Sequence, residues 1–307
     1  MASINNRLVI GTRGSKLALT QTQSVADALR HAYPLLEIEI QTIQTRGDAT
    51  QAANIPLSSF GEKGIFAKEL EAALLTGEID LAVHSMKDME HTLPPGLVIA
   101  AVPKREDPRD ALIGFALDAL PQGARVGTGS VRRRALLLSR RPDLRLLEIR
   151  GNIDTRLRKW RDGEYDAICL AVAGLNRLGL QNTIAEILDP DWFTPDPGQG
   201  ALALETRVGD MRVRNMVITL NDDTTWKATR AERSFLREIG GSCKTPVGAL
   251  GQEGGDSANL RGMVASPDGE IILREEIFAA KLSSEECGVH LAASLRAQGA
   301  DQLLTIQ

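Results

Sequence analysis

The feature that most limits what this chain can fold into is a regular alternation of short apolar runs with longer segments of helical spacing. The runs of strand length are Arg7–Gly11, Glu37–Ile43 and Ile79–His84. Helical spacing extends over Ser15–Tyr33 and Phe66–Leu75. Strands that alternate with helices in this way predict an α/β sheet with helical crossovers.

A second alternating block follows. Ala124–Gly127 and Ala167–Ala171 read as strands, and Val131–Arg140 and Ile153–Arg161 read as helices. The block closes around the proline- and glycine-rich run Pro195–Gly200. A second α/β sheet is therefore expected.

Two segments connect these blocks. The run Lys104–Asp110 is densely charged and is expected to be a crossover between the two sheets. The apolar run Ala201–Glu205 follows the second block and is a candidate to return to the first sheet. The first block would then be discontinuous in sequence.

The last part of the chain has a different texture. A helix is expected over Thr225–Ile239 and another over Glu285–Ala297. Between them, Leu260–Val264 and Ile271–Ile277 lie on either side of an Asp-Gly turn, which favours an antiparallel pair.

Length and composition bound the class of protein. A chain of 307 residues predicts two or three domains, and 43% apolar with 25% charged residues is ordinary for a soluble globular protein. No apolar stretch is long enough for a membrane span, and Met1–Val9 is too polar for a signal peptide, so the cytoplasm is the expected compartment. Cys169, Cys243 and Cys287 are widely spaced, which favours free thiols over disulfides or a zinc site.

The net charge of −4 hides a strong local imbalance. Between Arg125 and Arg161 there are twelve lysines or arginines and three acidic residues, so this segment carries +9. A basic block inside an acidic protein favours a small anion held in a cleft. Binding of nucleic acid is the rival interpretation, although Trp160 is the only aromatic residue in the block that bases could stack on.

Two junctions between a strand and a helix have the chemistry of anion sites. In Thr12-Arg13-Gly14-Ser15, backbone N–H groups and the guanidinium of Arg13 can meet a carboxylate or phosphate. The alternative is that Ser15 is only a helix cap and Arg13 a surface charge. In Gly127–Arg134, three arginines follow a glycine-rich turn that is neither a Walker A loop nor a dinucleotide fingerprint. Binding of a small anion is favoured there.

Further basic residues follow the next strands. Arg150 and Arg156 lie in the next such junction, and Arg177 lies in the one after it. If the sheet is parallel, these side chains converge with those of the glycine-rich turn, because parallel strands end at one edge.

Three other residues stand out in the sequence. Lys87-Asp88 comes directly after a buried strand and offers a cation and a proton acceptor, although a lysine-aspartate pair at a strand end is more often a loop salt bridge. His84, on the strand itself, is better explained as a satisfied core histidine than as a ligand. Cys243 follows two glycines and a serine in an open loop, where Lys244 can lower the pKa of its thiol. On spacing alone, a cysteine in a loop is more often just a small residue.

Taken together, these segments resemble the porphobilinogen deaminase (hydroxymethylbilane synthase) family over essentially the whole chain. The runs that carry the resemblance appear in family order: Thr12–Leu19, Thr45–Asp48, Lys63–Glu71, Ala82–Asp88, Arg105–Ala111, Gly127–Arg133, Arg150–Asn152, Gly198–Gly200, Ala231–Arg233 and Gly241–Cys243. Each run alone is weakly specific, but the ordered set is highly specific.

The resemblance implies an α/β fold of three domains. Two α/β domains built like periplasmic binding proteins would flank a cleft, and a smaller α+β domain would follow them. The expected boundaries are 1–102 with 199–219 for the first domain, 103–198 for the second and 220–307 for the third. A monomer is expected, without bound metal, nucleic acid or membrane.

The resemblance also implies the chemistry. Cys243 would hold a dipyrromethane cofactor through a thioether, and four porphobilinogen molecules would be joined head to tail with loss of ammonia. Asp88 is the implied catalytic residue, with Lys87 beside it. The implied cofactor-binding residues are Cys243, Lys87, Asp88, Ser130, Arg132 and Arg133. The implied substrate-binding residues are Arg13, Ser15, Lys63, Arg150, Arg156, Arg177 and Gln199.

The chain departs from the family pattern at a few positions. Ser59 stands where many relatives have a lysine, and Glu62 and Ser242 replace common glycines. Met89-Glu90 stands where valine and proline are frequent. The strongest alternative from another class is a solute-binding or sensor protein, which would need neither Cys243 nor a third domain.

Overall fold

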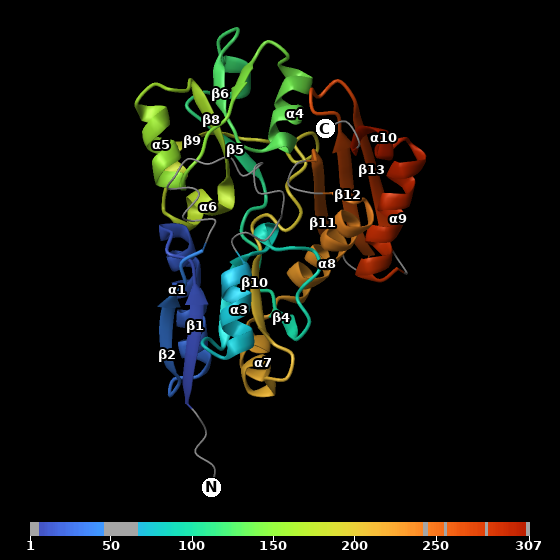
Figure 1. Ribbon diagram of the computed structural model, residues 1–307. Coiled ribbons are helices and arrows are strands. Elements are labelled where there is room, and N and C mark those ends of the chain that lie inside the picture. Colours follow the sequence, from blue (N-terminus) through green and yellow to red (C-terminus); the bar gives the residue numbers. More distant parts are fainter. Residues whose placement is uncertain (1–5, 46–66, 242–244, 255–256, 280–281, 305–307) are drawn as a thin grey trace. The chain divides into compact units, whose positions relative to one another are not determined.

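The computed structural model describes residues 6–45, 67–241, 245–254, 257–279 and 282–304 (Figure 1). The predictions made for Ser59, Glu62, Lys63, Ser242 and Cys243 lie outside the described residues. The chain forms two compact units, Met1–Arg105 with Ala201–Trp226, and Glu106–Gly200 with Lys227–Gln307.

The first unit contains a mixed five-stranded sheet. Its strands, in spatial order, are β2 (Glu37–Thr42), β1 (Arg7–Thr12), β3 (Leu81–Ser85), β10 (Leu202–Arg207) and β4 (Leu97–Ala101). Strands β2, β1 and β3 are parallel, whereas β10 runs antiparallel to both of its neighbours. The expected return of the chain after the second block to the first sheet is confirmed by β10.

Helices cover both faces of this sheet because its central strands are apolar on both sides. Leu8 and Ile10 of β1 pack with α1 (Lys16–Ala32) and α7 (Met211–Val217) in one core. Val9, between them in sequence, packs with α3 (Lys68–Thr76) in another core. The alternation of side chains along a strand thus assigns α1 and α3 to opposite faces.

The second unit contains another mixed five-stranded sheet. Its strands, in spatial order, are β7 (Arg145–Leu147), β6 (Arg125–Gly127), β8 (Ala167–Ala171), β5 (Asp110–Ile113) and β9 (Ile184–Ile187). Strands β7, β6 and β8 are parallel, and β5 runs antiparallel to both of its neighbours. The two sheets therefore share one pattern of strand directions, although the antiparallel strand comes last along the chain in the first sheet and first in the second.

Helices cover the two faces of this second sheet as well. Leu136 of α4 (Val131–Arg140) packs in a core on one face, and Leu157 of α5 (Ile153–Arg161) packs in a core on the other. The short helix α6 (Val172–Arg177) follows β8 directly. The bounds of α4, α5 and β8 are those expected from the sequence.

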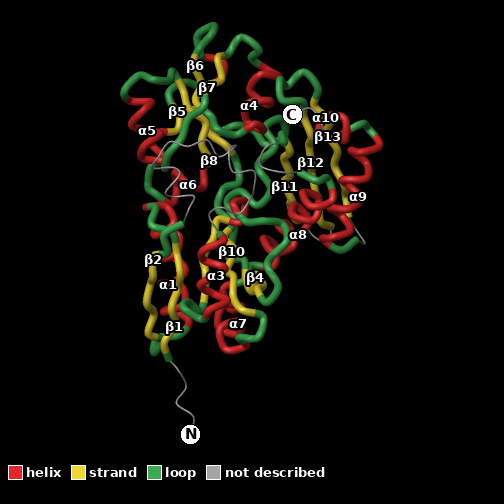
Figure 2. The backbone as a smooth tube through the Cα atoms, in the orientation of Figure 1, coloured by secondary structure: helices red, strands yellow, loops and turns green. Residues whose placement is uncertain are grey.

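The same unit contains a smaller antiparallel sheet of β11 (Val247–Gly254), β12 (Ser257–Ala265) and β13 (Ile272–Ala279). Strands β12 and β13 pair across the Asp-Gly turn, as predicted. Helices α9 (Ser284–Ala297) and α10 (Ala300–Leu304) contact this sheet, as Figure 2 shows. Phe235 of α8 (Asp223–Glu238) lies in the core between them. Glycine at position 240, with a φ of 72°, follows the end of α8.

The predicted fold class, two α/β domains and a smaller α+β domain, is confirmed by these three sheets. The sequence patterns did not indicate β4, β5, β7, β9, α6 or α7. These are short elements of three to seven residues, too short for hydrophobic periodicity to emerge. No helix in the described ranges has the length and apolar character to cross a bilayer.

Candidate active site

A small hollow in the first unit lies at the carboxyl ends of two parallel strands. Strand β1 ends just before Arg13, and β3 leads into a single 3-10 turn, Met86–Asp88. The polar side chains that line the hollow are Arg13, Gln21, His84, Ser85 and Asp88. The sequence-predicted Arg13 and Asp88 are thus brought together in one hollow.

Two neighbouring hydrogen bonds shape this hollow. The Oγ of Ser15, the N-cap of α1, accepts a hydrogen bond from the backbone N–H of Ala18 at 3.3 Å. The amide of Gln21, one turn farther along α1, donates to the Oγ of Ser85 at 3.1 Å. Ser15 is therefore a helix cap in the structure, and its hydroxyl hydrogen can still be donated to a ligand.

His84, which lines the hollow, belongs to a group of buried ionisable side chains. His84 is 6% exposed, and its Nε2 lies 2.9 Å from the Oε2 of Glu205, which is fully buried. Burial raises the pKa of a third group, the carboxyl of Glu71, to about 7, and the nearby charge of Glu205 adds to that rise. The expectation that His84 is a satisfied core histidine is confirmed, whereas Glu71 and Glu205 had no sequence signal.

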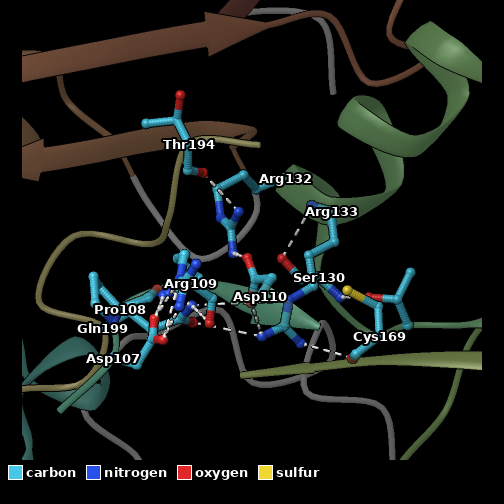
Figure 3. A network of polar contacts seen from close by, with 11 residues as sticks. Asp107, Pro108, Arg109, Asp110, Ser130, Arg132, Arg133, Cys169, Thr194 and Gln199 are labelled. Atoms are coloured by element: carbon cyan, nitrogen blue, oxygen red, sulfur yellow. Dashed lines mark hydrogen bonds and ion pairs between the residues drawn. The ribbon is translucent and has the colours of Figure 1, made fainter. Parts of the chain in front are cut away.

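The glycine-rich turn of the second unit leads into a buried network of charges (Figure 3). Asp110, the first residue of β5, is fully buried and accepts hydrogen bonds from Arg132 Nη2 at 2.7 Å and from Arg133 Nη2 at 2.6 Å. Both arginines also contact backbone carbonyls: Arg132 donates to Thr194 and Arg133 donates to Cys169. The two arginines are thus brought together by one carboxylate.

The charges of this network reinforce one another. Burial by itself would raise the pKa of Asp110, but the charges of Arg132 and Arg133 outweigh it and hold this pKa well below its usual range. Burial likewise opposes the charge on Arg133, yet Asp110 raises the pKa of that guanidinium. Asp110 and Arg133 therefore both stay ionised.

Gln199 joins the same network through an unusual backbone. Its side-chain amide donates to the carbonyl oxygen of Pro108 at 2.7 Å and to Asp110 Oδ1 at 2.9 Å. Gly198 and Gly200 on either side have φ values of 78° and 86°, in the left-handed region. A Cβ at Gly200 would lie 2.4 Å from the carbonyl oxygen of Glu106, so the run Gly-Gln-Gly suits this loop.

The other predicted arginines of the second unit lie near the ends of the parallel strands. Arg150, after β7, forms an ion pair with Glu148. Arg156 donates through Nε to the carbonyl of Gly151 at 2.7 Å, and Arg177 donates to the carbonyl of Gly200 at 2.7 Å. Ser130 caps α4, with its Oγ 3.4 Å from the N–H of Arg133.

Sequence reasoning missed two carboxylates that organise the second unit. Asp110 lies in a run that was expected to be a charged crossover, but it opens a buried strand. Glu232 is fully buried and accepts hydrogen bonds from the N–H groups of Gly198 and Gly251, at 2.6 and 2.8 Å. The apolar run Ala111–Ile113 directly after Asp110 is a weak sign of a strand, but nothing in the local sequence indicates that the aspartate is buried.

The hydrogen-bond donors of the predicted site residues suit carboxylate ligands. Guanidinium groups and serine hydroxyls at the ends of parallel strands bind carboxylate oxygens with directed hydrogen bonds. Among the described residues, no group of three histidine, cysteine, aspartate or glutamate side chains is arranged to hold a metal ion.

Comparison with protein families gives two matches. Residues 8–215 match the family described as porphobilinogen deaminase, dipyrromethane cofactor binding domain. Residues 226–297 match the porphobilinogen deaminase C-terminal domain. Both α/β sheets lie within the first match, and the antiparallel sheet lies within the second.

Individual relatives span nearly the full chain. A porphobilinogen deaminase of Roseiflexus castenholzii is 50% identical over 88% of this chain and 89% of its own. One of Thermus thermophilus is 47% identical over 97% of this chain and 98% of its own. Among solved structures, the methionine-binding protein MetQ covers 73% of this chain and 93% of its own, with 13% identity and a TM-score of 0.46.

Proposed function

Because the chain belongs to the porphobilinogen deaminase family, we propose that Asp88 and Lys87 carry its catalysis and that Cys243 holds its cofactor. The enzyme is a transferase, hydroxymethylbilane synthase, which joins four porphobilinogen molecules head to tail and releases ammonia. Its product is the linear tetrapyrrole hydroxymethylbilane, a precursor in porphyrin and heme biosynthesis. The family match across both α/β sheets is the observation that carries this assignment.

The described residues fit the dipyrromethane cofactor that the family model names. Arg132 is 3% exposed, and its Nε has no hydrogen-bond partner within the described ranges. The buried Oγ1 of Thr194 likewise has no hydrogen-bond partner within the described ranges. The backbone carbonyl of the same threonine accepts a hydrogen bond from Arg132. Two buried polar atoms without partners beside a cationic pair suit a carboxylate oxygen of such a group.

The residues proposed to hold the cofactor are Cys243, Lys87, Asp88, Ser130, Arg132 and Arg133. When bound, the dipyrromethane supplies the pyrrole carbon from which the chain is extended. A thioether at Cys243 would resist hydrolysis through repeated turnovers. Asp110 supports this role, because it fixes the side chains of Arg132 and Arg133 before any ligand arrives.

The proposed role of Asp88 is to meet the charge that develops on the substrate. Breaking the aminomethyl C–N bond of porphobilinogen releases ammonia and leaves positive charge on the pyrrole. The exposed carboxylate of Asp88 can stabilise this charge and accept the proton that the new C–C bond displaces. Arg13, in the same hollow, can meet a substrate carboxylate.

Each porphobilinogen also carries an acetate and a propionate group, so the growing product accumulates negative charge. The residues proposed to bind these groups are Arg13, Ser15, Lys63, Arg150, Arg156, Arg177 and Gln199. The +9 segment between Arg125 and Arg161, which includes Arg150 and Arg156, offers the acetate and propionate groups a partner of opposite sign.

The attachment at Cys243 is tested by intact-protein mass spectrometry. Purified enzyme is expected to weigh more than its polypeptide by the mass of the dipyrromethane, and Cys243→Ala is expected to lack this increment and all turnover. Cys287→Ala is the matched control, since Cys287 is a buried free thiol, and it should keep the adduct. A fully active enzyme with the mass of the bare polypeptide would refute the assignment.

The role of Asp88 is tested by Asp88→Asn, which keeps the size of the side chain and removes its charge. Turnover is expected to fall by about two to four orders of magnitude, the usual worth of a positioned acid or base. Asp27→Asn, on the exposed side of α1, should leave turnover unchanged. Normal turnover in Asp88→Asn would remove this residue from the mechanism.

We also propose that the enzyme works as a monomer in the cytoplasm. Light scattering at assay concentration should give the 33.2 kDa of one chain. Cell fractionation should recover the activity with the cytoplasmic markers.

A further inference from the structure

Three ionisable side chains that the mechanism above does not use lie together in the first unit. They are Glu71 of α3, His84 of β3 and Glu205 of β10, with exposed fractions of 5%, 6% and 0%. Charged side chains are rarely buried this deeply unless they are paired. We call this set the acid cluster.

The fold brings the acid cluster together from three distant parts of the sequence. His84 lies opposite Ala203 in the β3–β10 register, and Glu205 lies opposite Ala82. Opposite residues share a face, and so do alternate residues along a strand, so His84 and Glu205 are diagonal neighbours on one face. Ala82 packs in the same core as the apolar residues of α3, which places Glu71 over that face.

The acid cluster has more negative than positive groups. His84 bonds one oxygen of Glu205 at 2.9 Å, while the other oxygen, Oε1, is buried with no hydrogen-bond partner within the described ranges. The pKa of Glu71 is raised to about 7 by burial, then by Glu205 and Glu90, while His84 and Lys68 act in the opposite direction. Glu71 is therefore protonated below about pH 7 and adds a negative charge above it.

The acid cluster reaches the active site through His84. This side chain lines the same hollow as Arg13 and Asp88. Glu71 interacts electrostatically with His84, so a change in its charge acts on the hollow through a region of low dielectric, where screening by water is weak. The hollow is therefore more attractive to an anion when the acid cluster carries its extra proton.

We propose that the acid cluster is a positioning element that sets the pH range in which the hollow binds a carboxylate of porphobilinogen. With Glu71 protonated, its side chain has no negative charge that would weaken the binding of the substrate carboxylate to Arg13. With Glu71 ionised, the added negative charge weakens that binding. This inference rests on the proposed placement of the substrate at Arg13 and Asp88.

The test is the pH dependence of KM for porphobilinogen between pH 6 and 8, measured on enzyme that carries its cofactor. In the unchanged protein KM is expected to rise about threefold as the pH passes 7, with a smaller change in kcat. Glu71→Gln should abolish this rise. Glu78→Gln, which removes an exposed carboxylate just after α3, is the matched control and should follow the unchanged protein. Titration of the substrate amine is common to all variants and cancels.

Two further variants predict shifts of opposite sign. Glu205→Gln removes a charge that raises the pKa of Glu71, so the rise in KM should move to lower pH. His84→Gln removes a group that lowers this pKa, so the rise should move to higher pH. These shifts decide the matter if Glu71→Gln does not fold. A KM curve in Glu71→Gln that overlays the unchanged protein, or shifts of the same sign in the other two, would overturn the proposal.

The Asp88→Asn experiment separates this inference from the proposed function. Full turnover in Asp88→Asn would remove Asp88 from catalysis, whatever the KM curves show. Identical KM curves with an inactive Asp88→Asn would instead reject the acid cluster alone.

Discussion

The two units solve the same physical problem, a buried carboxylate, in opposite ways. In the second unit Asp110 lies between two guanidinium groups, and its pKa is held far below the usual range. In the first unit burial, reinforced by the nearby charge of Glu205, raises the pKa of Glu71 to about 7. Burial raises the pKa of both carboxyl groups, and only Asp110 has two guanidinium groups beside it whose charges outweigh that effect.

This difference suits the two units to different tasks. The Asp110 network stays fully ionised across the physiological pH range, so it offers fixed donors to an anionic ligand. The acid cluster exchanges a proton near neutrality. Charges that stay fixed can bind an anionic ligand throughout the physiological pH range, whereas a group that titrates near neutrality changes its charge with the pH.

Asp110→Asn is the variant with the largest expected effect on the difference between the two units. Removing the carboxylate leaves Arg132 and Arg133 buried without their shared counter-charge, which is expected to cost about 3 to 5 kcal/mol of unfolding free energy. Urea unfolding measures this loss, and mass spectrometry should also show less cofactor on the chain. Asp191→Asn, in a surface pair with Arg261, is the matched control and should cost less than about 1 kcal/mol. Equal losses in the two variants would mean that the Asp110 network does not stabilise the unit.

Glu71→Gln tests the other side of the comparison. The folded-state pKa of Glu71 lies above its ordinary value of 4.5, so protonation favours the folded state, and stability falls as the pH rises from about 4.5 to about 7. Between pH 5 and 8 the unchanged protein should lose about 2 to 3 kcal/mol that Glu71→Gln retains. Urea unfolding at both pH values measures this gap.

Asp110 provides the internal contrast for that pH experiment. Its folded-state pKa lies below its ordinary value, so its stabilisation is complete above about pH 4 and is lost only in stronger acid. Its contribution should not change between pH 5 and 8. A gap between Glu71→Gln and the unchanged protein that stays constant with pH would place the titration elsewhere.

The smallest expected effect comes from the helix caps of the two units. Ser15→Ala and Ser130→Ala each remove an N-cap hydrogen bond of similar length, 3.3 and 3.4 Å, and each should cost about 1 kcal/mol. These losses should be equal and independent of pH, because neither hydroxyl titrates. A much larger loss of activity than of stability would show that the hydroxyl also contacts a ligand.

Long periodic segments were predictable from the sequence, whereas short strands with charged residues were not. Val131–Arg140 has apolar and arginine residues at helical spacing, and its bounds agree with the structure. Strand β5 has four residues and opens with Asp110, so its local pattern resembles a loop. Its charge is tolerated because two arginines more than twenty residues later reach it, which no local pattern records.

The candidate site was predictable to the same degree. Arg13, Asp88, Arg132 and Arg133 follow strand ends or glycine turns, which local sequence marks clearly. The acid cluster is not marked, because Glu205 lies 121 residues after His84 and meets it only through the register of β3 and β10. The order and register of the strands, not the local sequence, determine which ionisable residues on buried strands meet.

Strand β10 also has a consequence for the order in which the protein can be made. The first sheet needs this strand between β3 and β4, yet about a hundred residues that form another sheet are translated before it. A nascent chain that has left the ribosome only as far as Arg105 therefore presents two strands with no partner between them. Such open edges attract other chains, and the long sequence separation slows their closure. Shielding by a chaperone during this interval should raise the yield of active enzyme, and Glu205 completes the acid cluster only when the interval ends.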